Sequence, residues 1–304
     1  MLLIFIFSCI IIAFDYIVKD IRYRKTEYYD QTHLSYLQMR LDKGRYGEYL
    51  TYKSLNQIAG YKKYLFNCYI PKEDGNTTEI DVILLHESGI YVFESKNYSG
   101  WIFGTETQKQ WTQVLPVGKG KSQKSHFMNP IIQNKVHIKW LQNYIGREYS
   151  FPIYSFIVFS ERCTLKDVTL TSYTHHVVNR YNLTYAVKQN TSLTEYCISS
   201  EKIDALFNKL YPLTQVSEAQ KLVHVMQFYQ ENVEVKKFSA PGNVFEKEAT
   251  GNEGEQAGGQ HEKKCPRCGA ALAQRTALKG KRAGRGFWGC SNYPKCRYIE
   301  NIDE

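Results

Sequence analysis

Residues 79–97 read EIDVILLHESGIYVFESKN, and this stretch decides the fold of the chain. Two apolar runs, 80–85 and 90–93, are rich in the β-branched and aromatic residues that favour strands. Between them lies the turn segment 86–89, HESG, which ends in a glycine that accepts a positive φ without steric cost. The pattern therefore predicts a β-hairpin.

This hairpin brings two carboxylates and an ammonium to one face of a sheet. If Leu85 faces Ile90 across the turn, the same register sets Asp81 beside Glu94. Lys96 lies two residues beyond Glu94 and therefore shares its face. Two adjacent carboxylates suit a hard divalent cation such as Mg²⁺, and a nearby lysine can position the water that attacks a phosphate. On spacing alone, the alternative is an edge-strand salt bridge between Lys96 and an acid.

The surrounding residues resemble a known family. Asp81 followed by Glu94-Ser95-Lys96 is the D…(D/E)-x-K arrangement of the PD-(D/E)XK nuclease superfamily. More narrowly, an ordered series over roughly residues 40–160 resembles the NERD (nuclease-related) domain. The series consists of Gly44-Arg45-Tyr46-Gly47-Glu48, Glu79-Ile80-Asp81, the segment 89–97, Gly100, Trp111 and Asn129-Pro130-Ile131-Ile132-Gln133.

The resemblance implies an α/β fold with an αβββαβ restriction-endonuclease-like core. It implies that Asp81 and Glu94 hold Mg²⁺ or Mn²⁺, with Glu48 aimed at the metal from the first helix. It also implies that Lys96 positions the attacking water and that Gln133 orients Lys96 or a phosphate. The same fold hosts proteins that do not cut, so a non-catalytic DNA-binding or accessory protein is the alternative.

Further elements of this core are predicted along the chain. Residues 20–60 are compatible with helices, with Gly44 and Gly47 marking a close approach between helix and hairpin, and 64–71 predicts a strand that completes a three-strand meander. Asn129-Pro130 begins a helix, because asparagine caps well and proline suits the first turn. His137 lies on one face of that helix with Gln133 and is read as a solvated or satisfied histidine. Residues 155–160 predict a buried strand.

Two segments beside the core have less regular patterns. Residues 99–113 predict an irregular hairpin, in which Trp101 and Trp111 are read as packing residues, with base stacking as the alternative. Residues 118–125, GKGKSQKS, lack the GxxxxGK[ST] spacing of a phosphate loop, so we expect a mobile basic loop able to touch a phosphate backbone. The pair His175-His176 predicts an outer strand with surface histidines.

Length and charge limit the function classes. The 304 residues allow one full domain and a smaller one, and the formal net charge of +9 favours nucleic acid or the anionic leaflet of a membrane as partner. Four of the eight cysteines are scattered and four cluster near the C-terminus, which indicates reduced thiols and a metal site.

The N-terminal residues 1–18 are almost wholly apolar, and only Asp15 interrupts them. A helix of this length rises about 27 Å, just enough to span a bilayer. Four basic residues follow within 19–25, so the positive-inside rule predicts a single-pass anchor in a bacterial-type inner membrane, with the rest of the chain in the cytoplasm. The alternatives are a cleaved signal peptide, whose basic start and cleavage site are missing here, and a monotopic or buried helix.

The C-terminal part begins with an extension and a linker. Residues 200–232 show two helical patterns broken at Pro212, which predict a helical hairpin packed on the sheet. Residues 236–262 are rich in Gly, Glu and Gln and too poor in apolar residues to build a core, so a flexible linker is expected.

The last forty or so residues predict a zinc site that binds DNA. Cys265 and Cys268 are followed by Cys290 and Cys296, and four thiolates paired in this way suit tetrahedral Zn²⁺, with two disulfides as the alternative. The segment resembles the C-terminal zinc ribbon of type IA topoisomerases, which implies binding of single-stranded DNA. Basic and aromatic residues offer phosphate contacts and stacking faces: Arg275, Lys279, Lys281, Arg282, Arg285, Phe287, Trp288 and Tyr293. A purely structural or protein-binding ribbon is the alternative.

The sequence thus predicts a membrane-anchored, metal-dependent nuclease that hydrolyses DNA. The expected organisation is a transmembrane anchor at 1–18, a basic juxtamembrane helical segment at 19–38, the nuclease-like domain at 39–165, an extension at 166–235, a linker at 236–262 and a zinc ribbon at 263–300.

Overall fold

The computed structural model describes residues 1–118, 120–172, 174–194, 196–227, 263–276, 286–292 and 296–301. The chain forms two compact units, Met1–Pro241 and Gly242–Glu304, and each is treated by itself. The expected linker at 236–262 lies outside the described residues.

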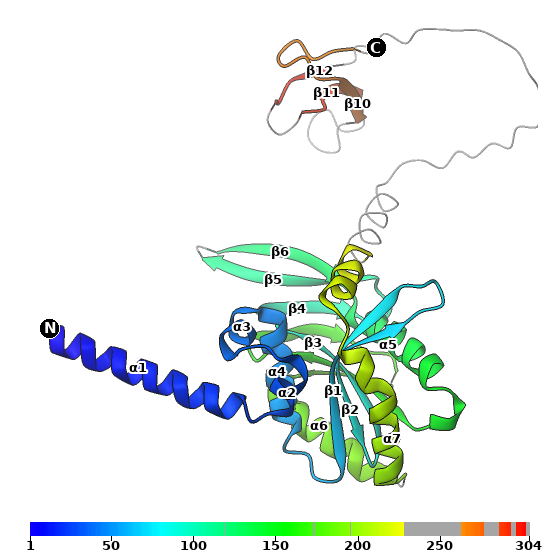
Figure 1. The fold of residues 1–304 in the computed structure, drawn as a ribbon. Coiled ribbons are helices and arrows are strands. Elements are labelled where there is room, and N and C mark those ends of the chain that lie inside the picture. The colour runs from blue at the N-terminus through cyan, green and yellow to red at the C-terminus, as the bar shows by residue number, and fades with distance from the viewer. Residues whose placement is uncertain are drawn as a thin grey trace, which may run out of the picture. The chain divides into compact units, whose positions relative to one another are not determined.

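The first unit alternates helices and strands, as an α/β core requires (Figure 1). Its helices are α1 (Leu2–Tyr23), α2 (Glu27–Thr32), α3 (Tyr36–Leu41), α4 (Lys43–Leu55), α5 (Pro130–Ile145), α6 (Arg180–Leu193) and α7 (Ser200–Leu210), with short 3-10 turns η1 (Arg147–Tyr149) and η2 (Tyr211–Thr214). Its strands are β1 (Lys62–Pro71), β2 (Thr77–His86), β3 (Gly89–Lys96), β4 (Gly100–Thr105), β5 (Gln110–Gly118), β6 (Lys121–Met128), β7 (Ile153–Phe159), β8 (Cys163–Thr169) and β9 (His175–Asn179).

The central sheet has the strand order β1-β2-β3-β7-β9. β1, β2 and β3 form the expected antiparallel meander, whereas β7 and β9 run parallel to β3. The order α4, β1, β2, β3, α5, β7 gives the expected αβββαβ succession, with β4, β5 and β6 inserted before α5. The inserted strands and β8 form a second sheet of order β6-β5-β4-β8.

The hairpin of β2 and β3 has the register predicted from the sequence. Leu85 pairs with Ile90, and regular pairing continues to Val82 and Phe93. The turn needs a glycine at position 89, because φ is +144° there and a Cβ would lie 2.8 Å from the carbonyl oxygen of Pro152.

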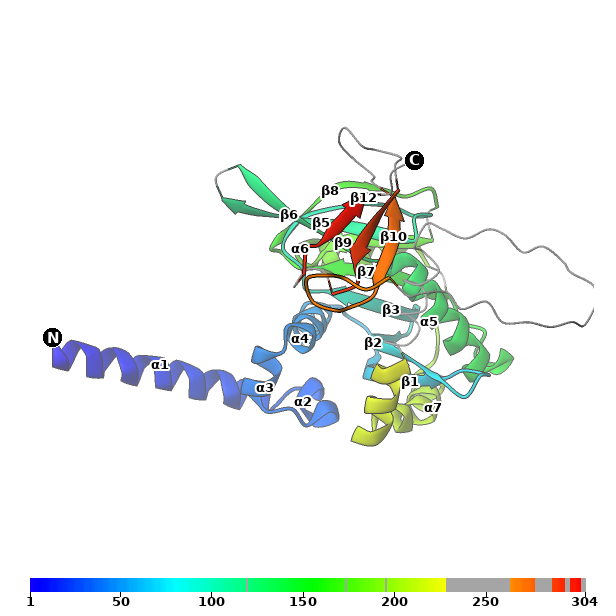
Figure 2. The same cartoon turned by 90° about the horizontal axis from the view of Figure 1, so that it is seen from above.

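Helices cover both faces of the central sheet and bury two apolar clusters. On one face, β2 residues Val82 and Leu84 pack with side chains of α2, α4 and α6. On the other face, Ile83 and Leu85 pack with α5 and α7. Figure 2, seen from above, shows α5 and α7 on one side of the sheet and α4 on the other. Glu94 and Lys96 follow Ile90 and Val92 at two-residue spacing, so they face α5, where the site is formed.

A buried aromatic cluster connects α1 to this core. Tyr23, at the end of α1, is fully buried and lies edge-on to Tyr29 and Tyr49. The rest of α1 leaves its apolar side chains exposed, and Figure 1 shows the helix extending away from the first unit. In the parts of the chain that the structure describes, no helix combines the length and apolarity needed to cross a membrane, so the transmembrane span expected at 1–18 is not supported.

Two local predictions were wrong. The segment 118–125 is not a loop: β6 covers 121–128 and pairs with β5 from Gly118↔Lys121 to Gln110↔Met128. Its polar sequence hides this strand because it lies at a sheet edge with no buried face of its own. β9 is an outer strand as expected, but His175 is buried and His176 stacks on Phe156 with 4.4 Å between ring centroids. These histidines therefore pack against the fold.

Candidate active site and zinc centre

An open cleft of about 490 Å³ lies between β2 and α5. Its wall is completed by the helical segment 218–227, which belongs to the C-terminal extension. The lining residues include Thr77, Thr78, Glu79, Asp81, Met128, Gln133, Val136, His137, His224, Val225 and Gln227. Two of the predicted catalytic residues, Asp81 and Gln133, therefore face the same cleft.

Lys96 connects the predicted residues of β3 and α5. Its Nζ lies 2.6 Å from Oε1 of Glu94 and donates to Oε1 of Gln133 at 3.1 Å. Glu94 is almost fully buried, with 2% of its side chain exposed, whereas Lys96 keeps 18% exposed. The structure thus brings Glu94, Lys96 and Gln133 into one contact network, with the ammonium held in a fixed position.

His137 belongs to the same network: of the two expected alternatives it is the satisfied histidine and not the solvated one, since it is buried and both ring nitrogens have partners. Its Nε2 lies 3.1 Å from Oε2 of Glu94, and its Nδ1 lies 2.6 Å from Oγ1 of Thr78. Lys96 and His137 together occupy both carboxylate oxygens of Glu94. The four-residue spacing from Gln133, which places both side chains on one helix face, is the sequence signal for this role.

Asp81 lies where the central sheet is locally distorted. Pairing of β1 with β2 runs to Phe66↔Val82 and resumes at Cys68↔Ile80, and between these pairs Asn67 adopts a left-handed φ of 50°. Asparagine tolerates this conformation better than most residues. Asp81 uses Oδ2 to accept a hydrogen bond of 2.8 Å from the backbone N–H of Ser95. Asp81 therefore lies opposite the break in the pairing, and the hydrogen bond from Ser95 holds its carboxylate.

Glu48 approaches from α4 and is buried. Its Oε2 accepts hydrogen bonds from Tyr28 at 3.2 Å, Asn67 at 2.8 Å and Arg45 at 3.3 Å. Within the described part of the chain, Oε1 of Glu48 accepts no hydrogen bond. α4 comes this close because Gly47 has no side chain: a Cβ there would lie 3.0 Å from Cβ of Asn97. This confirms the close approach of helix and hairpin expected at Gly47.

Burial and neighbouring charges shift the pKa values of Asp81, Glu94 and Lys96 in different directions. Burial raises the pKa of Asp81 well above its usual range, and the negative charges of Glu94 and Glu48 raise it further. Burial also disfavours ionised Glu94, but the Lys96 ammonium and the His137 hydrogen bond outweigh this effect and lower its pKa to about 2. Burial opposes the charge of Lys96, yet Glu94 and Asp81 raise its pKa. The site therefore contains the Glu94–Lys96 ion pair beside Asp81, a carboxyl whose negative charge is disfavoured.

This donor set fits a divalent cation. Asp81, Glu94 and Glu48 influence one another electrostatically, and a cation near Asp81 would relieve the repulsion that raises its pKa. Carboxylate oxygens are the ligands that Mg²⁺ prefers. Glu94 can serve as a ligand because each carboxylate oxygen accepts more than one partner.

Several residues of the cleft were not foreseen. Thr78 and His224 line it, and His224 contacts Thr77 through Nδ1 at 2.9 Å and lies 4.0 Å from Glu79. His224 comes from a helical segment far along the chain, so no local pattern could place it at the hairpin.

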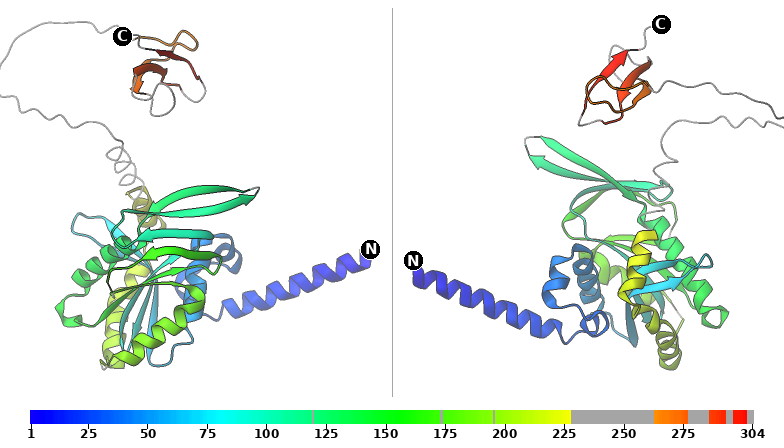
Figure 3. Two further views of the ribbon diagram at one scale, coloured as in Figure 1. Left: turned by 180° about the vertical axis from the view of Figure 1, so that it is seen from behind. Right: turned by 45° about the horizontal axis from the view of Figure 1, so that its top comes forward.

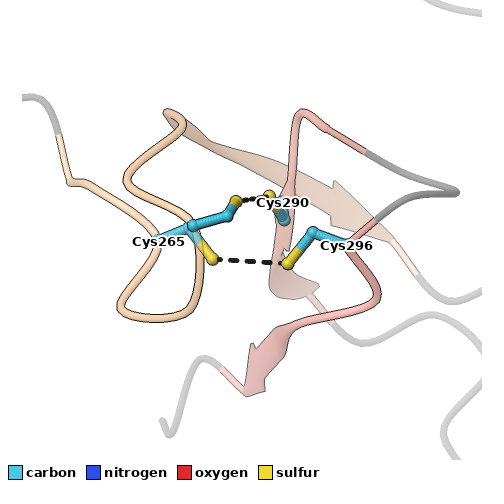
Figure 4. Close-up of side chains that lie close together, drawn as sticks. Cys265, Cys290 and Cys296 are labelled. Carbon is cyan, nitrogen blue, oxygen red and sulfur yellow. Dashed lines mark hydrogen bonds between the residues drawn. The ribbon is translucent and has the colours of Figure 1, made fainter.

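The second unit contains a compact four-cysteine cluster. Figure 4 shows Cys265, Cys290 and Cys296 with their sulfur atoms turned toward one another. Sγ of Cys265 lies 3.8 Å from that of Cys296, Sγ of Cys268 lies 3.4 Å from that of Cys290, and all four sulfurs lie within 4.8 Å of one another. Tetrahedral Zn²⁺ with Zn–S bonds near 2.3 Å separates its sulfurs by about 3.8 Å. The cysteines are free thiols, so the two-disulfide alternative does not hold and the cluster fits Zn²⁺.

The scaffold of this cluster is a small sheet of β10 (Leu272–Thr276), β11 (Gly286–Cys290) and β12 (Ile299–Asn301). Phe287 and Trp288 lie in β11, and Arg275 lies in β10 at the register position opposite Phe287. Lys279, Lys281, Arg282, Arg285 and Tyr293 were also predicted to contact nucleic acid, and they lie outside the described residues.

Comparison with known proteins agrees with both halves of this arrangement. Residues 43–160 match the model of the nuclease-related domain, and residues 262–304 match that of the topoisomerase DNA-binding C4 zinc finger. An uncharacterized protein of Bacillus anthracis is 33% identical over 169 residues, which cover 55% of this chain and 75% of that protein. The chain belongs to the nuclease-related domain family.

The zinc unit has a relative of its own. DNA topoisomerase 1 of Methanocaldococcus jannaschii is 48% identical over 40 residues, which cover 13% of this chain and 5% of that protein. The likeness is therefore confined to the zinc finger. No solved structure matches the chain.

Proposed function

We propose that the protein is a metal-dependent nuclease that hydrolyses phosphodiester bonds of DNA. The observation that carries the proposal is Lys96, held between Glu94 and Gln133, together with the cleft that Gln133 and Asp81 line. Membership of the nuclease-related domain family supports phosphodiester chemistry, and the topoisomerase-type zinc finger supports DNA as the substrate.

In this proposal each residue has a separate task. Asp81 and Glu94 hold Mg²⁺ or Mn²⁺, and Glu48 assists through Oε1. The metal, when bound, acidifies a water and neutralises charge that develops on the phosphate. Lys96 positions the attacking water and stabilises the negative charge of the transition state, while Gln133 keeps the ammonium in place.

The test is cleavage of linear, circular and single-stranded DNA by the full chain with Mg²⁺, Mn²⁺ or EDTA. We expect metal-dependent cutting that falls at least a hundredfold in Lys96→Ala, because electrostatic stabilisation of this kind is worth about 10²–10³ in rate. Lys202→Ala removes an exposed lysine of α7 and serves as control. Cutting by Lys96→Ala at the control's rate would refute the assignment.

Asp81→Ala separates the nuclease from a DNA-binding platform. The nuclease proposal expects this variant to lose cutting and to retain DNA binding. A wild-type protein that binds DNA and cuts none with either metal would instead support the non-catalytic alternative.

We further propose that α1 attaches the protein to a membrane by lying in its interface, with the rest of the chain on the cytoplasmic side. The support is the row of exposed apolar side chains, among them Ile4, Phe5, Ile12 and Phe14, each about two-thirds or more exposed. The basic residues within 19–25 suit an anionic leaflet. Flotation with vesicles tests this: deletion of residues 2–14, which keeps Tyr23, should leave the protein unbound. Equal flotation of both forms would refute it.

A further inference from the structure

We propose that the hairpin of β5 and β6 is an arm that contacts the phosphate backbone of double-stranded DNA next to the cleft, through Lys121 and Lys124. The proposal rests on the proposed function, since it names duplex DNA as the partner of that site.

The arm projects from the fold and is exposed along one strand. Figure 1 shows the hairpin of β5 and β6 extending beyond β4, its neighbour in the second sheet, and the right panel of Figure 3 shows the same projection from another direction. Every residue of β6 from 121 to 126 is exposed. A two-stranded ribbon of this kind has the dimensions that fit a groove of DNA.

The base of the arm is rigid. Trp111 of β5 is fully buried and pairs with Phe127 of β6. Trp111 also stacks on Phe159 of β7 at 6.0 Å between ring centroids, with only 3° between the ring planes. The indole N–H of Trp111 donates to the carbonyl oxygen of Thr105 at 2.9 Å. A stiff base lets the arm hold a partner in a fixed position relative to the sheet that carries the site.

The charge of the arm is of one sign. Residues 109–128 contain four lysines and one histidine and no aspartate or glutamate. Lys121 and Lys124 form no ion pair within the described residues, so their charges are available to an anion. Apart from Val117 at 57% exposure and Met128 at 40%, the exposed side chains of the arm are small or polar. This composition favours a phosphate backbone over an apolar protein surface.

One face of the arm continues the cleft. Met128 lines the cleft, and His126 and Lys124 follow it at two-residue spacing on the same face of β6. His126 bonds to Thr112 of β5 at 3.1 Å, on the side opposite the Trp111 and Phe127 pair. Four residues of strand span about 13 Å, which is roughly four base pairs along a duplex. A duplex whose scissile phosphate enters the cleft would therefore present further phosphates to Lys124 on this face. Lys121 starts from the other face of the strand, but it lies at the tip of the arm, where β6 begins, and from there its long side chain can reach the same backbone.

A competing explanation is protection of a sheet edge. β6 is the outermost strand of its sheet, and lysines on edge strands discourage pairing with other chains. That explanation accounts for the lysines but predicts no effect on DNA binding, so the two can be separated by experiment.

The test is DNA affinity of the full chain in the Lys96→Ala background without added Mg²⁺, so that cleavage does not interfere. Anisotropy of a labelled 20-base-pair duplex is measured from 50 to 200 mM salt for the arm variant Lys121→Ala/Lys124→Ala. The matched control is Lys188→Ala/Lys202→Ala, which removes two exposed lysines of α6 and α7. Loss of two phosphate contacts should make the plot of log K against log salt shallower by about 1.8. The control should keep the original slope.

A second readout locates the contact. A photo-crosslinking residue at Ser122, which is exposed and shares the face of Lys124 and Met128, should capture the duplex, whereas the same residue at Lys188 should not. Equal slopes for the arm variant and its control would overturn the proposal, as would absence of crosslinking at Ser122. Aggregation of the arm variant with an unchanged slope would assign the lysines to edge protection. Failure of wild type to cut, with the slope changed as expected, would refute the nuclease and leave the arm standing.

Discussion

Glu94 has both of its carboxylate oxygens committed, one to Lys96 and one to His137. The contact with His137 fixes the rotation of the carboxylate, because Thr78 holds the far side of the imidazole at 2.6 Å. We infer that His137 is a positioning residue: it orients Glu94 and does not itself react.

Replacement of His137 tests this role. His137→Ala should raise the metal concentration needed for half-maximal cutting and lower the rate about tenfold or more, since a misplaced carboxylate costs transition-state stabilisation. His137→Gln keeps a donor for Glu94 and should recover part of both losses. Metal titrations of cutting provide the measurement, with Gln142→Ala, an exposed site on the same helix, as control. Reduced stability with an unchanged metal requirement would make the histidine merely structural.

At the scale of elements, the closeness of α4 to β3 depends on Gly47. In an ordinary helix, Gly→Ala stabilises by up to about 1 kcal/mol. Here the new Cβ would lie 3.0 Å from Cβ of Asn97 and 3.3 Å from Oγ of Ser95, so α4 must move away from the strand that carries Lys96. We expect Gly47→Ala to lower both the melting temperature and the cutting rate. Lys53→Ala, on the exposed side of α4, should change neither, and a more stable, fully active Gly47→Ala would contradict this prediction.

Glu106, the residue after β4, is hydrogen-bonded to the loop before β9. Its carboxylate accepts from the backbone N–H of Thr171 and of Ser172 and from both hydroxyls, each at 2.9 Å, and Lys135 lies 3.2 Å away. The backbone and hydroxyl hydrogen bonds of Thr171, followed by those of Ser172 and Lys135, hold the pKa of Glu106 well below its usual 4.5.

The sign of its pH dependence follows from that lowered pKa. The ionised form is favoured in the folded state, so its contribution to stability is complete above pH 4.5 and is lost as the pH falls toward the folded-state pKa. The melting temperature of the wild type should therefore exceed that of Glu106→Gln at pH 7, and the difference between the two should shrink below pH 4.5. A melting-temperature difference that stays constant from pH 7 to pH 3 would contradict this account.

Which elements the sequence predicted depends on whether the signal is local. The hairpin of β2 and β3 was confirmed in register, because its apolar runs and the glycine at 89 are adjacent in sequence. The distortion at Asn67 was missed, since the partner of this residue, Glu48, lies on another element and no local pattern joins them. β6 was missed because an exposed edge strand of Lys, Ser and Gln carries no alternation of burial.

The residues of the site also divide into those that a local sequence pattern predicts and those that only the tertiary fold brings together. Glu94 and Lys96 share one face of β3 because they lie two residues apart, and Lys96 contacts Gln133 of α5. The catalytic roles of the three residues remain predictions. His224 could not be inferred, because the helical segment 218–227 reaches the cleft only through the tertiary fold.

At the scale of the whole molecule, the two units have separate cores. The cysteine cluster packs with Leu272, Trp288 and Tyr298, all within the second unit. A unit this small depends on its metal to fold. Cys268→Ser should therefore remove bound zinc and weaken binding of single-stranded DNA, while the melting transition of the first unit stays in place. Zinc analysis and calorimetry measure both effects, and loss of the first unit's transition would show that the units do not fold independently.

One contact made by α1 links distant parts of the first unit. Tyr23, at the end of that helix, lies 6.4 Å from the ring of Tyr28, and the hydroxyl of Tyr28 donates to Glu48 at 3.2 Å. Rings in a close-packed interior cannot shift singly, so a tilt of α1 displaces its neighbours as well. The side chains of Tyr23 and Tyr28 thus connect α1 to the buried Glu48. Contacts that fix the orientation of α1 therefore also fix the position of Glu48.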